Sequence, residues 1–159
     1  MNIKLICVGK IRENYLAEGI RDYAGRITPY ARLEIAEVAD EKAAENLSTK
    51  ETTQVLEREG AKIAKHLADD AYKIALTING KPLSSVKLAA ALADLGVSGR
   101  SKLNFIIGGS LGLAPEIIAA AHMQLSLSQM TFPHQLARLI LLEQIYRAFR
   151  INNGEPYHK

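Results

Sequence analysis

The sequence predicts an α/β fold in which a parallel sheet is flanked by helices on both faces. Short apolar runs alternate with segments of helical periodicity along the whole chain, an order that is typical of β-α units. The 159 residues are enough for a single domain with a hydrophobic core. No repeat, low-complexity segment or linker divides them, so we expect one domain over residues 1–159.

Three strands and two helices are expected in the first half of the chain. Residues 3–9 and 72–78 are apolar runs, and 33–39 alternates like a half-exposed strand. Residues 13–27 carry apolar side chains at helical spacing, and the charged run 40–67 shows the same periodicity. The sequence NGKP at 79–82 predicts a turn that closes the third strand.

The second half continues the alternation, with helices that begin at a capping serine or at a proline. Ser84 or Ser85 is a plausible N-cap for a helix that runs to about residue 95. The strand 102–109 ends in glycines, and Pro115 begins a short helix. After the last strand, 123–128, Pro133 begins a helix that extends to about Arg150.

The composition is that of an ordinary globular protein, with 48% hydrophobic and 23% charged residues. No apolar run approaches the roughly 20 residues of a membrane span, and the N-terminus does not resemble a secretion signal. We therefore expect a cytoplasmic protein with no membrane partner. Cys7 lies in an apolar run and is expected to be a small buried hydrophobe. The four histidines are scattered, so no metal site is expected.

The net charge of +3 is unevenly distributed along the chain. Both ends of the chain are basic, and residues 33–70 are acidic. An anionic partner would therefore meet the ends, although a mixed, solvated surface explains the same pattern. Charge alone does not establish binding to nucleic acid.

Three strand ends are candidates for a ligand site, because ligands of open α/β sheets bind beyond the carboxyl ends of the strands. They are the region around Leu76, the segment IIGGSLG at 106–112, and the polar loop at 126–135. The glycine spacing is G-G-x-x-G, which differs from the dinucleotide pattern, and no P-loop is present. Such a cleft suits a cofactor without phosphates that is held by backbone groups and apolar walls. S-adenosylmethionine fits that description.

The segments FIIGGSLG and LSLSQMTFPHQLARLILLEQIYRAF and the ending GEPYHK resemble the RlmH family. These bacterial enzymes methylate N3 of a pseudouridine in the 23S ribosomal RNA of the large subunit. The resemblance covers the whole chain and implies a homodimer with a SPOUT-type α/β fold. It also implies a C-terminal trefoil knot over approximately 72–150, followed by a substrate-facing tail at 151–159.

By the same resemblance, the S-adenosylmethionine contacts fall on two strand ends and one loop, at Leu76, Gly108, Leu127, Ser128, Gln129, Met130, Thr131 and Phe132. Leu76, Leu127 and Phe132 could wall an adenine, and Gly108 would let the backbone approach the cofactor. We therefore expect valine at Gly108 to block the cofactor while it leaves the fold largely intact.

The tail is expected to serve the RNA substrate. N3 of a uracil-type ring carries a proton that must leave before the nitrogen can accept a methyl group, so the site needs a base, cations, or both. His158, Tyr157 and Arg150 are the candidate catalytic residues, and the group that removes the proton stays open. Candidate RNA contacts are the basic residues Lys159, Arg147, Lys10 and Arg12. We expect a flexible tail with few buried contacts that closes over the target nucleotide.

Two other functions remain open on the sequence. A non-catalytic factor could bind RNA through the basic ends alone. A nucleotide-dependent enzyme of the doubly wound type is disfavoured by the missing phosphate-binding patterns. No DNA partner is expected.

Overall fold

The computed structural model describes residues 1–157, which contain one sheet of five strands in the order β2-β1-β4-β3-β5. All neighbouring strands are parallel, as the alternation predicted. The strands are β1 (Asn2–Val8), β2 (Arg32–Val38), β3 (Tyr72–Pro82), β4 (Lys102–Ile107) and β5 (Met123–Ser126). Their carboxyl ends share one edge of the sheet, because parallel strands point the same way.

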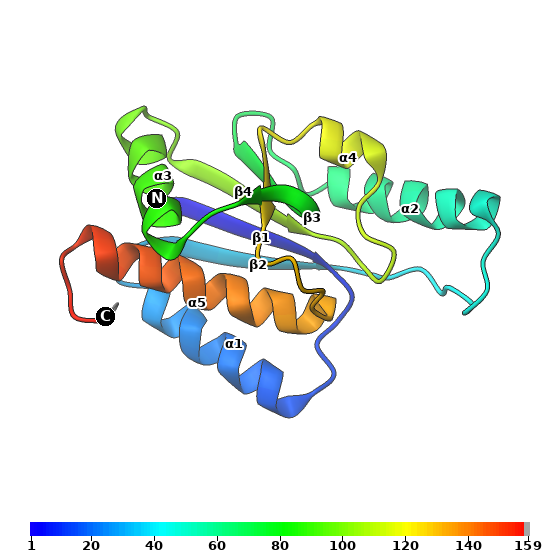
Figure 1. Ribbon diagram of the computed structural model, residues 1–159, viewed down its shortest axis with the longest axis horizontal. Helices are drawn as coiled ribbons and strands as arrows, with labels where there is room; N and C mark the ends of the chain where they lie inside the picture. Colours follow the sequence, from blue (N-terminus) through cyan, green and yellow to red (C-terminus); the bar gives the residue numbers. More distant parts are fainter. Residues whose placement is uncertain (158–159) are drawn as a thin grey trace.

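Helices cover both faces of the sheet (Figure 1). One face carries α1 (Asn14–Ile27), α3 (Ser85–Val97) and α5 (His134–Asn152), and the other carries α2 (Thr49–Ala64) and α4 (Pro115–Ala119). Burial on both faces explains why the inner strands β1 and β4 read as nearly continuous apolar runs, whereas the edge strand β2 alternates. The central strand β4 is buried at five of its six positions.

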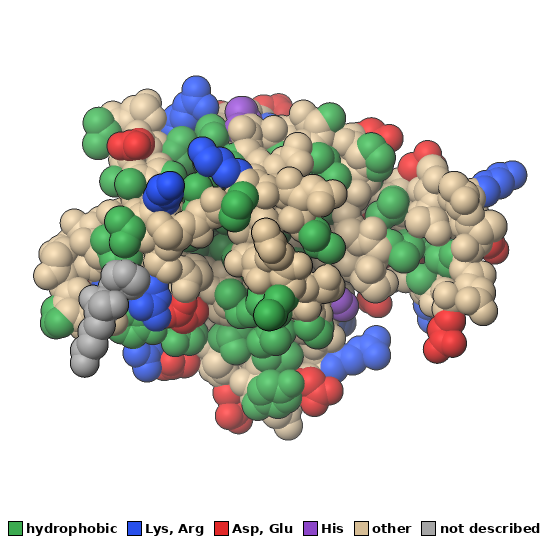
Figure 2. Space-filling model, in the orientation of Figure 1, with side chains coloured by type: hydrophobic (Ala, Val, Ile, Leu, Met, Phe, Trp, Pro, Cys, Tyr) green, Lys and Arg blue, Asp and Glu red, His purple; other side chains and the backbone are tan. Residues whose placement is uncertain are grey.

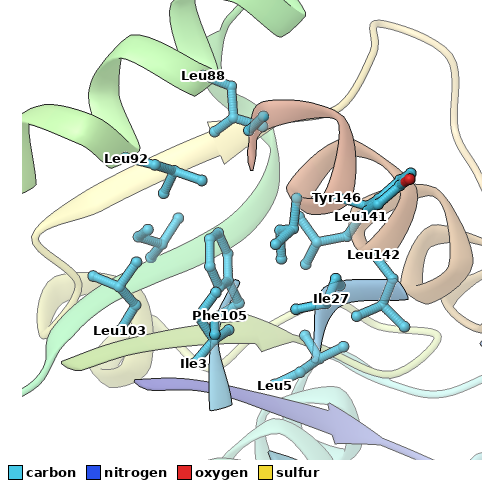
Figure 3. Packing of buried hydrophobic residues seen from close by; sticks show 14 of the residues in the cluster. Ile3, Leu5, Ile27, Leu88, Leu92, Leu103, Phe105, Leu141, Leu142 and Tyr146 are labelled. Carbon is cyan, nitrogen blue, oxygen red and sulfur yellow. The ribbon is translucent and has the colours of Figure 1, made fainter. Parts of the chain in front are cut away.

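The core has one cluster on each face of the sheet. Successive residues of a strand point to opposite faces, so Leu5 belongs to one cluster and Ile6 to the other. The larger cluster fills the space between the central strands and α1, α3 and α5 (Figure 3). Its labelled members include Ile3, Leu5, Ile27, Leu88, Leu92, Leu103, Phe105, Leu141, Leu142 and Tyr146.

The helix starts follow the sequence signals, with one correction. The Ser84 side chain accepts a hydrogen bond from the Lys87 backbone N–H at 3.2 Å, and Pro115 and Pro133 stand at the starts of α4 and α5. The charged run 40–67, however, is helical only over Thr49–Ala64. Ser48 starts this helix through a capping box with Glu51, which satisfies backbone groups at the helix end.

The expected turn at 79–82 is wrong, because β3 continues through Pro82. Leu76 and Lys81 both pair with Leu125 of β5, so residues 77–80 form a bulge between two pairings. Gly80 permits this arrangement, since a Cβ there would lie 2.6 Å from the Leu125 carbonyl carbon. Pairing with β5 overrides the local turn preference of Asn-Gly.

A buried arginine fixes the start of α5 to the carboxyl ends of two strands. Arg138 is only 1% exposed. Its Nη1 donates to Glu37 Oε1 at 2.6 Å, and its Nη2 donates to the Gly9 carbonyl at 2.9 Å. Glu37 belongs to β2, and Gly9 directly follows β1. The guanidinium therefore sets the position of α5 relative to the sheet edge where ligands are expected.

We predict that Arg138→Met lowers the free energy of unfolding by about 1–2 kcal/mol, because it leaves the Gly9 carbonyl without its donor and the partly exposed Glu37 without its cation. Chemical denaturation measures the change. Lys102→Met is the matched control, since it removes the exposed pair with Asp70 and should lower stability by less than about 1 kcal/mol. Equal losses in the two variants would contradict a special role for Arg138.

Candidate active site

A cavity of about 800 Å³ opens at the carboxyl ends of β3, β4 and β5, and we call it the strand-end cavity. All three strand ends singled out in the sequence contribute to its wall. Seven of the eight predicted cofactor contacts line it: Leu76, Gly108, Leu127, Ser128, Met130, Thr131 and Phe132. Gln129 is not among the lining residues. The structure therefore brings segments from residues 76 to 137 into one site.

The glycine segment after β4 forms a tight turn in one wall of the strand-end cavity. The Gly112 N–H donates to the Gly109 carbonyl at 3.1 Å, and Gly112 has a positive φ of 87°. A Cβ on Gly108 would overlap the Gly112 carbonyl. Gly108 thus lets the chain approach itself, so the expectation that valine there would leave the fold largely intact is wrong.

The loop after β5 is shaped by its own serines. The Ser126 hydroxyl donates to the Ser128 carbonyl at 3.0 Å, and the Met130 N–H donates to the Ser128 hydroxyl at 2.9 Å. These local bonds turn the backbone in the manner typical of short polar loops. Pro133 then leads directly into α5, whose first turn contributes His134 and Ala137 to the cavity wall.

The wall of the strand-end cavity is mainly apolar and carries no Lys, Arg, Asp or Glu among the described residues. Three large apolar side chains at the cavity are exposed: Ile78, Leu111 and Met130. Thr77 Oγ1 is buried without a hydrogen-bond partner. A ligand with apolar surface and a polar atom near Thr77 would satisfy both features.

His134 is a lining residue to which the sequence reasoning assigned no role. Its pKa is lowered, first by burial and then by the nearby positive charge of Arg138, so the ring is neutral at pH 7. The sequence did contain a signal for this residue, because His134 directly follows Pro133 in the polar loop at a strand end. Its partial burial beside Gly9 and the effect of the Arg138 charge depend on the tertiary structure.

Residues 153–157 lie at the far end of α5 from the strand-end cavity (Figure 1). Glu155 pairs with Arg150 at 2.5 Å and accepts a hydrogen bond from the Tyr30 hydroxyl. Tyr157 packs edge-on against Tyr146, with ring centroids 4.9 Å apart. The expectation of a flexible tail with few buried contacts is therefore wrong for residues 155–157.

The Tyr157 hydroxyl is held by two partners. It lies 3.2 Å from the Tyr23 hydroxyl and donates to Glu143 Oε1 at 3.1 Å. Burial, followed by these bonds, raises its pKa, so the hydroxyl stays protonated at neutral pH. Tyr157 is therefore anchored to its own subunit in this structure.

The predicted RNA contacts lie in two separate places. Lys10 and Arg12 are exposed in the loop between β1 and α1, where the Arg12 N–H donates to Gln135 Oε1 at 3.2 Å. Arg147 pairs with Glu143 at 2.5 Å and lies over the Tyr157 ring. His158 and Lys159 lie outside the described residues.

Cys7 is buried, as predicted, at 1% exposure. Burial raises the pKa of its thiol to about 12, so it is unreactive at neutral pH. Within residues 1–157, no helix is long and apolar enough to cross a membrane. The same residues contain no group of three or more His, Cys, Asp or Glu side chains that could hold a metal ion.

Comparison with known proteins identifies relatives over the whole chain. A family described as "Predicted SPOUT methyltransferase" matches residues 1–158. A protein of Clostridioides difficile named ribosomal RNA large subunit methyltransferase H is 57% identical, and the match spans all of both chains. A protein with the same name from Bifidobacterium animalis subsp. lactis is 54% identical, again over all of both chains.

Solved structures share the fold at much lower identity. A probable methyltransferase from Bordetella pertussis has a TM-score of 0.54 at 13% identity, with 92% of this chain and 95% of the other covered. A probable methylase family protein from Haemophilus influenzae has a TM-score of 0.52 at 13% identity, with coverage of 99% and 70%. These similarities concern the fold alone.

We predict that Gly108→Ala destabilises the protein, because its new Cβ meets backbone that cannot rotate away. The expected loss is about 2 kcal/mol or more in the free energy of unfolding. Gly25→Ala is the control, since nothing lies near a Cβ at that position of α1 and alanine favours helix by about 0.5–1 kcal/mol. A Gly108→Ala protein with unchanged stability would contradict the tight turn.

Proposed function

The chain belongs to the SPOUT methyltransferase family, and from that premise we propose that it transfers a methyl group from S-adenosylmethionine to ribosomal RNA of the large subunit. The observation that carries the proposal is the strand-end cavity, whose wall combines the glycine turn, the loop at 127–132 and apolar side chains. The names of the full-length relatives support ribosomal RNA as the substrate.

The residues of the strand-end cavity fit S-adenosylmethionine. When bound, this cofactor supplies a methyl group on a positively charged sulfonium sulfur. Leu76, Leu127 and Phe132 offer apolar surface for the adenine, and the buried Thr77 hydroxyl offers an unused hydrogen bond. A wall without lysine or arginine avoids repulsion of the sulfonium, whereas a dinucleotide would need groups that hold its phosphates.

We further propose that the atom methylated in the RNA is N3 of a pseudouridine. The protein is proposed to act in the cytoplasm. The support is the likeness of the loop at 127–132 and of the chain ending to the RlmH family. Lys10 and Arg12 stand on the exposed loop beside Gln135 and are suited to phosphates of the RNA backbone. Phosphate contacts of this kind position the RNA, while the cavity selects the base.

The knot implied by the family is part of the same proposal, over approximately residues 72–150. Its support is the resemblance to the RlmH family. The position of β3 between β4 and β5, with parallel pairing to both, is compatible with it.

A homodimer completes the proposed enzyme. Figure 2 shows hydrophobic side chains gathered over α5 and α1. On α5, Leu136, Leu139 and Ile140 are only partly buried, while Leu142 belongs to the core. A partly exposed apolar face on two helices suits a second copy of the chain.

The position of Tyr157 supports a dimer with a shared site. Tyr157 contacts Glu143, which is nine residues and about 14 Å along α5 from His134 at the cavity. The described end of the tail is thus held beside the second half of its own α5, away from the cavity at the first turn of this helix. A tail that serves the reaction is therefore proposed to act at the cavity of the partner subunit.

Calorimetry separates the proposed enzyme from the two alternatives. We expect S-adenosylmethionine and its demethylated product to bind and NAD not to bind. Methyl transfer is then measured side by side on free large-subunit RNA, subunits and whole ribosomes, and the methylated base is located by mass spectrometry of nuclease fragments. RNA binding without cofactor binding or transfer would favour the non-catalytic factor, and NAD binding would favour the nucleotide-dependent enzyme.

Subunit mixing tests the shared site. A protein that lacks residues 158–159 and a Leu127→Arg protein, whose cation would disfavour the cofactor, should each be inactive. Mixed dimers should recover about a quarter of the wild-type rate, because half of the dimers are mixed and each contains one intact site. Each variant alone, taken through the same mixing procedure, is the control. A mixture without activity, although mass spectrometry detects mixed dimers, would refute the shared site.

A further inference from the structure

Within residues 1–157, His134 is the one side chain of the strand-end cavity that can exchange a proton near neutral pH. The other lining residues are apolar, glycine, hydroxyl-bearing or amide side chains. A reaction in this cavity that requires removal of a proton therefore has one candidate base in the described wall. The site residues that the resemblance to the RlmH family implies do not include His134.

The position of His134 is built by the residues around it. It is the first residue of α5 and directly follows the loop at 127–133. Gly9 has a positive φ of 86°, and a Cβ there would lie 3.1 Å from His134 Nε2. The imidazole thus packs against bare backbone at the end of β1, and no hydrogen bond or ion pair to another described residue occupies its ring.

Burial and two nearby cations keep the ring of His134 neutral. Burial and the cations of Arg138 on α5 and Arg12 after β1 lower its pKa, while Asp40 after β2 acts in the opposite direction. The net result is a pKa below the ordinary value of 6.5. One ring nitrogen therefore has a free electron pair throughout the neutral range, and the ring gains its proton only under acidic conditions.

The other candidate catalytic groups that the structure describes cannot act as a base at neutral pH. The Tyr157 hydroxyl has a raised pKa and is bonded to Tyr23 and Glu143. Arg150 is paired with Glu155, and hydrogen bonding with Tyr30 raises its pKa further. Both groups keep their protons and remain suited to positioning.

We infer that His134 is the catalytic base that accepts the proton from the target nitrogen of the RNA base. This inference rests on the proposed function. The N3–H proton moves to the unprotonated ring nitrogen of His134, and the N3 electron pair forms the new bond to the methyl carbon. The carbon–sulfur bond breaks, its electron pair stays on sulfur as a neutral thioether, and the imidazolium passes its proton to water.

The neighbouring arginine also has a consequence after the transfer. Arg138 lies one helical turn from His134 on the same side of α5. Its positive charge disfavours the imidazolium, so the proton is released to water readily and the ring returns to its neutral form. The same charge makes His134 a weaker base than a free histidine, but it keeps the ring unprotonated and able to accept a proton at neutral pH.

His134→Gln tests the inference, because glutamine keeps hydrogen-bonding groups but cannot accept the proton. Single-turnover methyl transfer to the RNA is measured between about pH 5 and 8.5, together with S-adenosylmethionine affinity by calorimetry. We expect a rate loss of about 10²–10⁴-fold, loss of the acid limb of the pH profile, and nearly unchanged cofactor affinity. Nuclear magnetic resonance of the wild-type protein should give the His134 ring a pKa that matches the acid limb.

His66→Gln is the matched control, since His66 lies just after α2 and outside the cavity wall. It should leave both the rate and the pH profile unchanged. His134→Asn repeats the test if the glutamine variant fails to fold, and thermal unfolding checks both proteins.

Several outcomes would overturn the inference. A His134→Gln protein that transfers methyl groups at the wild-type rate, or keeps the acid limb, would show that another group takes the proton. A loss of cofactor affinity equal to the loss in rate would make His134 a binding residue. If the wild-type protein binds S-adenosylmethionine but methylates no ribosomal RNA, the proposed function itself fails, and the inference fails with it.

Discussion

The buried Arg138 guanidinium is the interaction on which the arrangement of the site depends. A charge that is 1% exposed is tolerated because Glu37 and the Gly9 carbonyl accept hydrogen bonds from its two Nη groups, although its Nε has no partner. These partners belong to the ends of two strands, so one side chain fixes α5 against the sheet edge. His134 and Ala137 then form part of the cavity wall. Burial of the neighbouring imidazole lowers its pKa most, and the cation that positions the helix lowers it further, so Arg138 links the fold to the proton chemistry.

The rest of the cavity is shaped by close approaches of backbone to backbone. Gly108 meets the Gly112 carbonyl, and Gly80 meets β5 at Leu125, so neither position has room for a side chain. Walls made this way expose peptide groups and apolar residues and place no charge in the cavity. That composition suits a sulfonium cofactor better than a phosphate, because a cation needs neither lysine nor a phosphate-binding loop. The selectivity of the site therefore follows from the side chains that are absent as well as from those present.

The sequence predicted the parallel sheet and the cavity because both depend on local patterns. Strands buried on two faces read as apolar runs, and glycine or polar loops mark their carboxyl ends. The errors lie where distant residues decide the outcome. Pairing with β5 extends β3 through Asn79 and Gly80, and contacts with Tyr23 and Glu143 hold Tyr157 near the chain end. The positions of Arg138 and His134 depend on three elements that meet only in the folded chain.

The two ends of α5 have different surroundings, and this division is the structural argument for the proposed homodimer. The helix has 19 residues and is about 28 Å long. Its first turn belongs to the cavity, and its second half holds Tyr157 through Glu143 and Tyr146. A rigid helix cannot bring its own ends together. A twofold axis that crosses the apolar face of α5 between its ends would place the end of one helix beside the start of its partner. The partly exposed Leu136, Leu139 and Ile140 lie in the half of α5 nearer the cavity, so an interface there would draw the partner's tail toward the site.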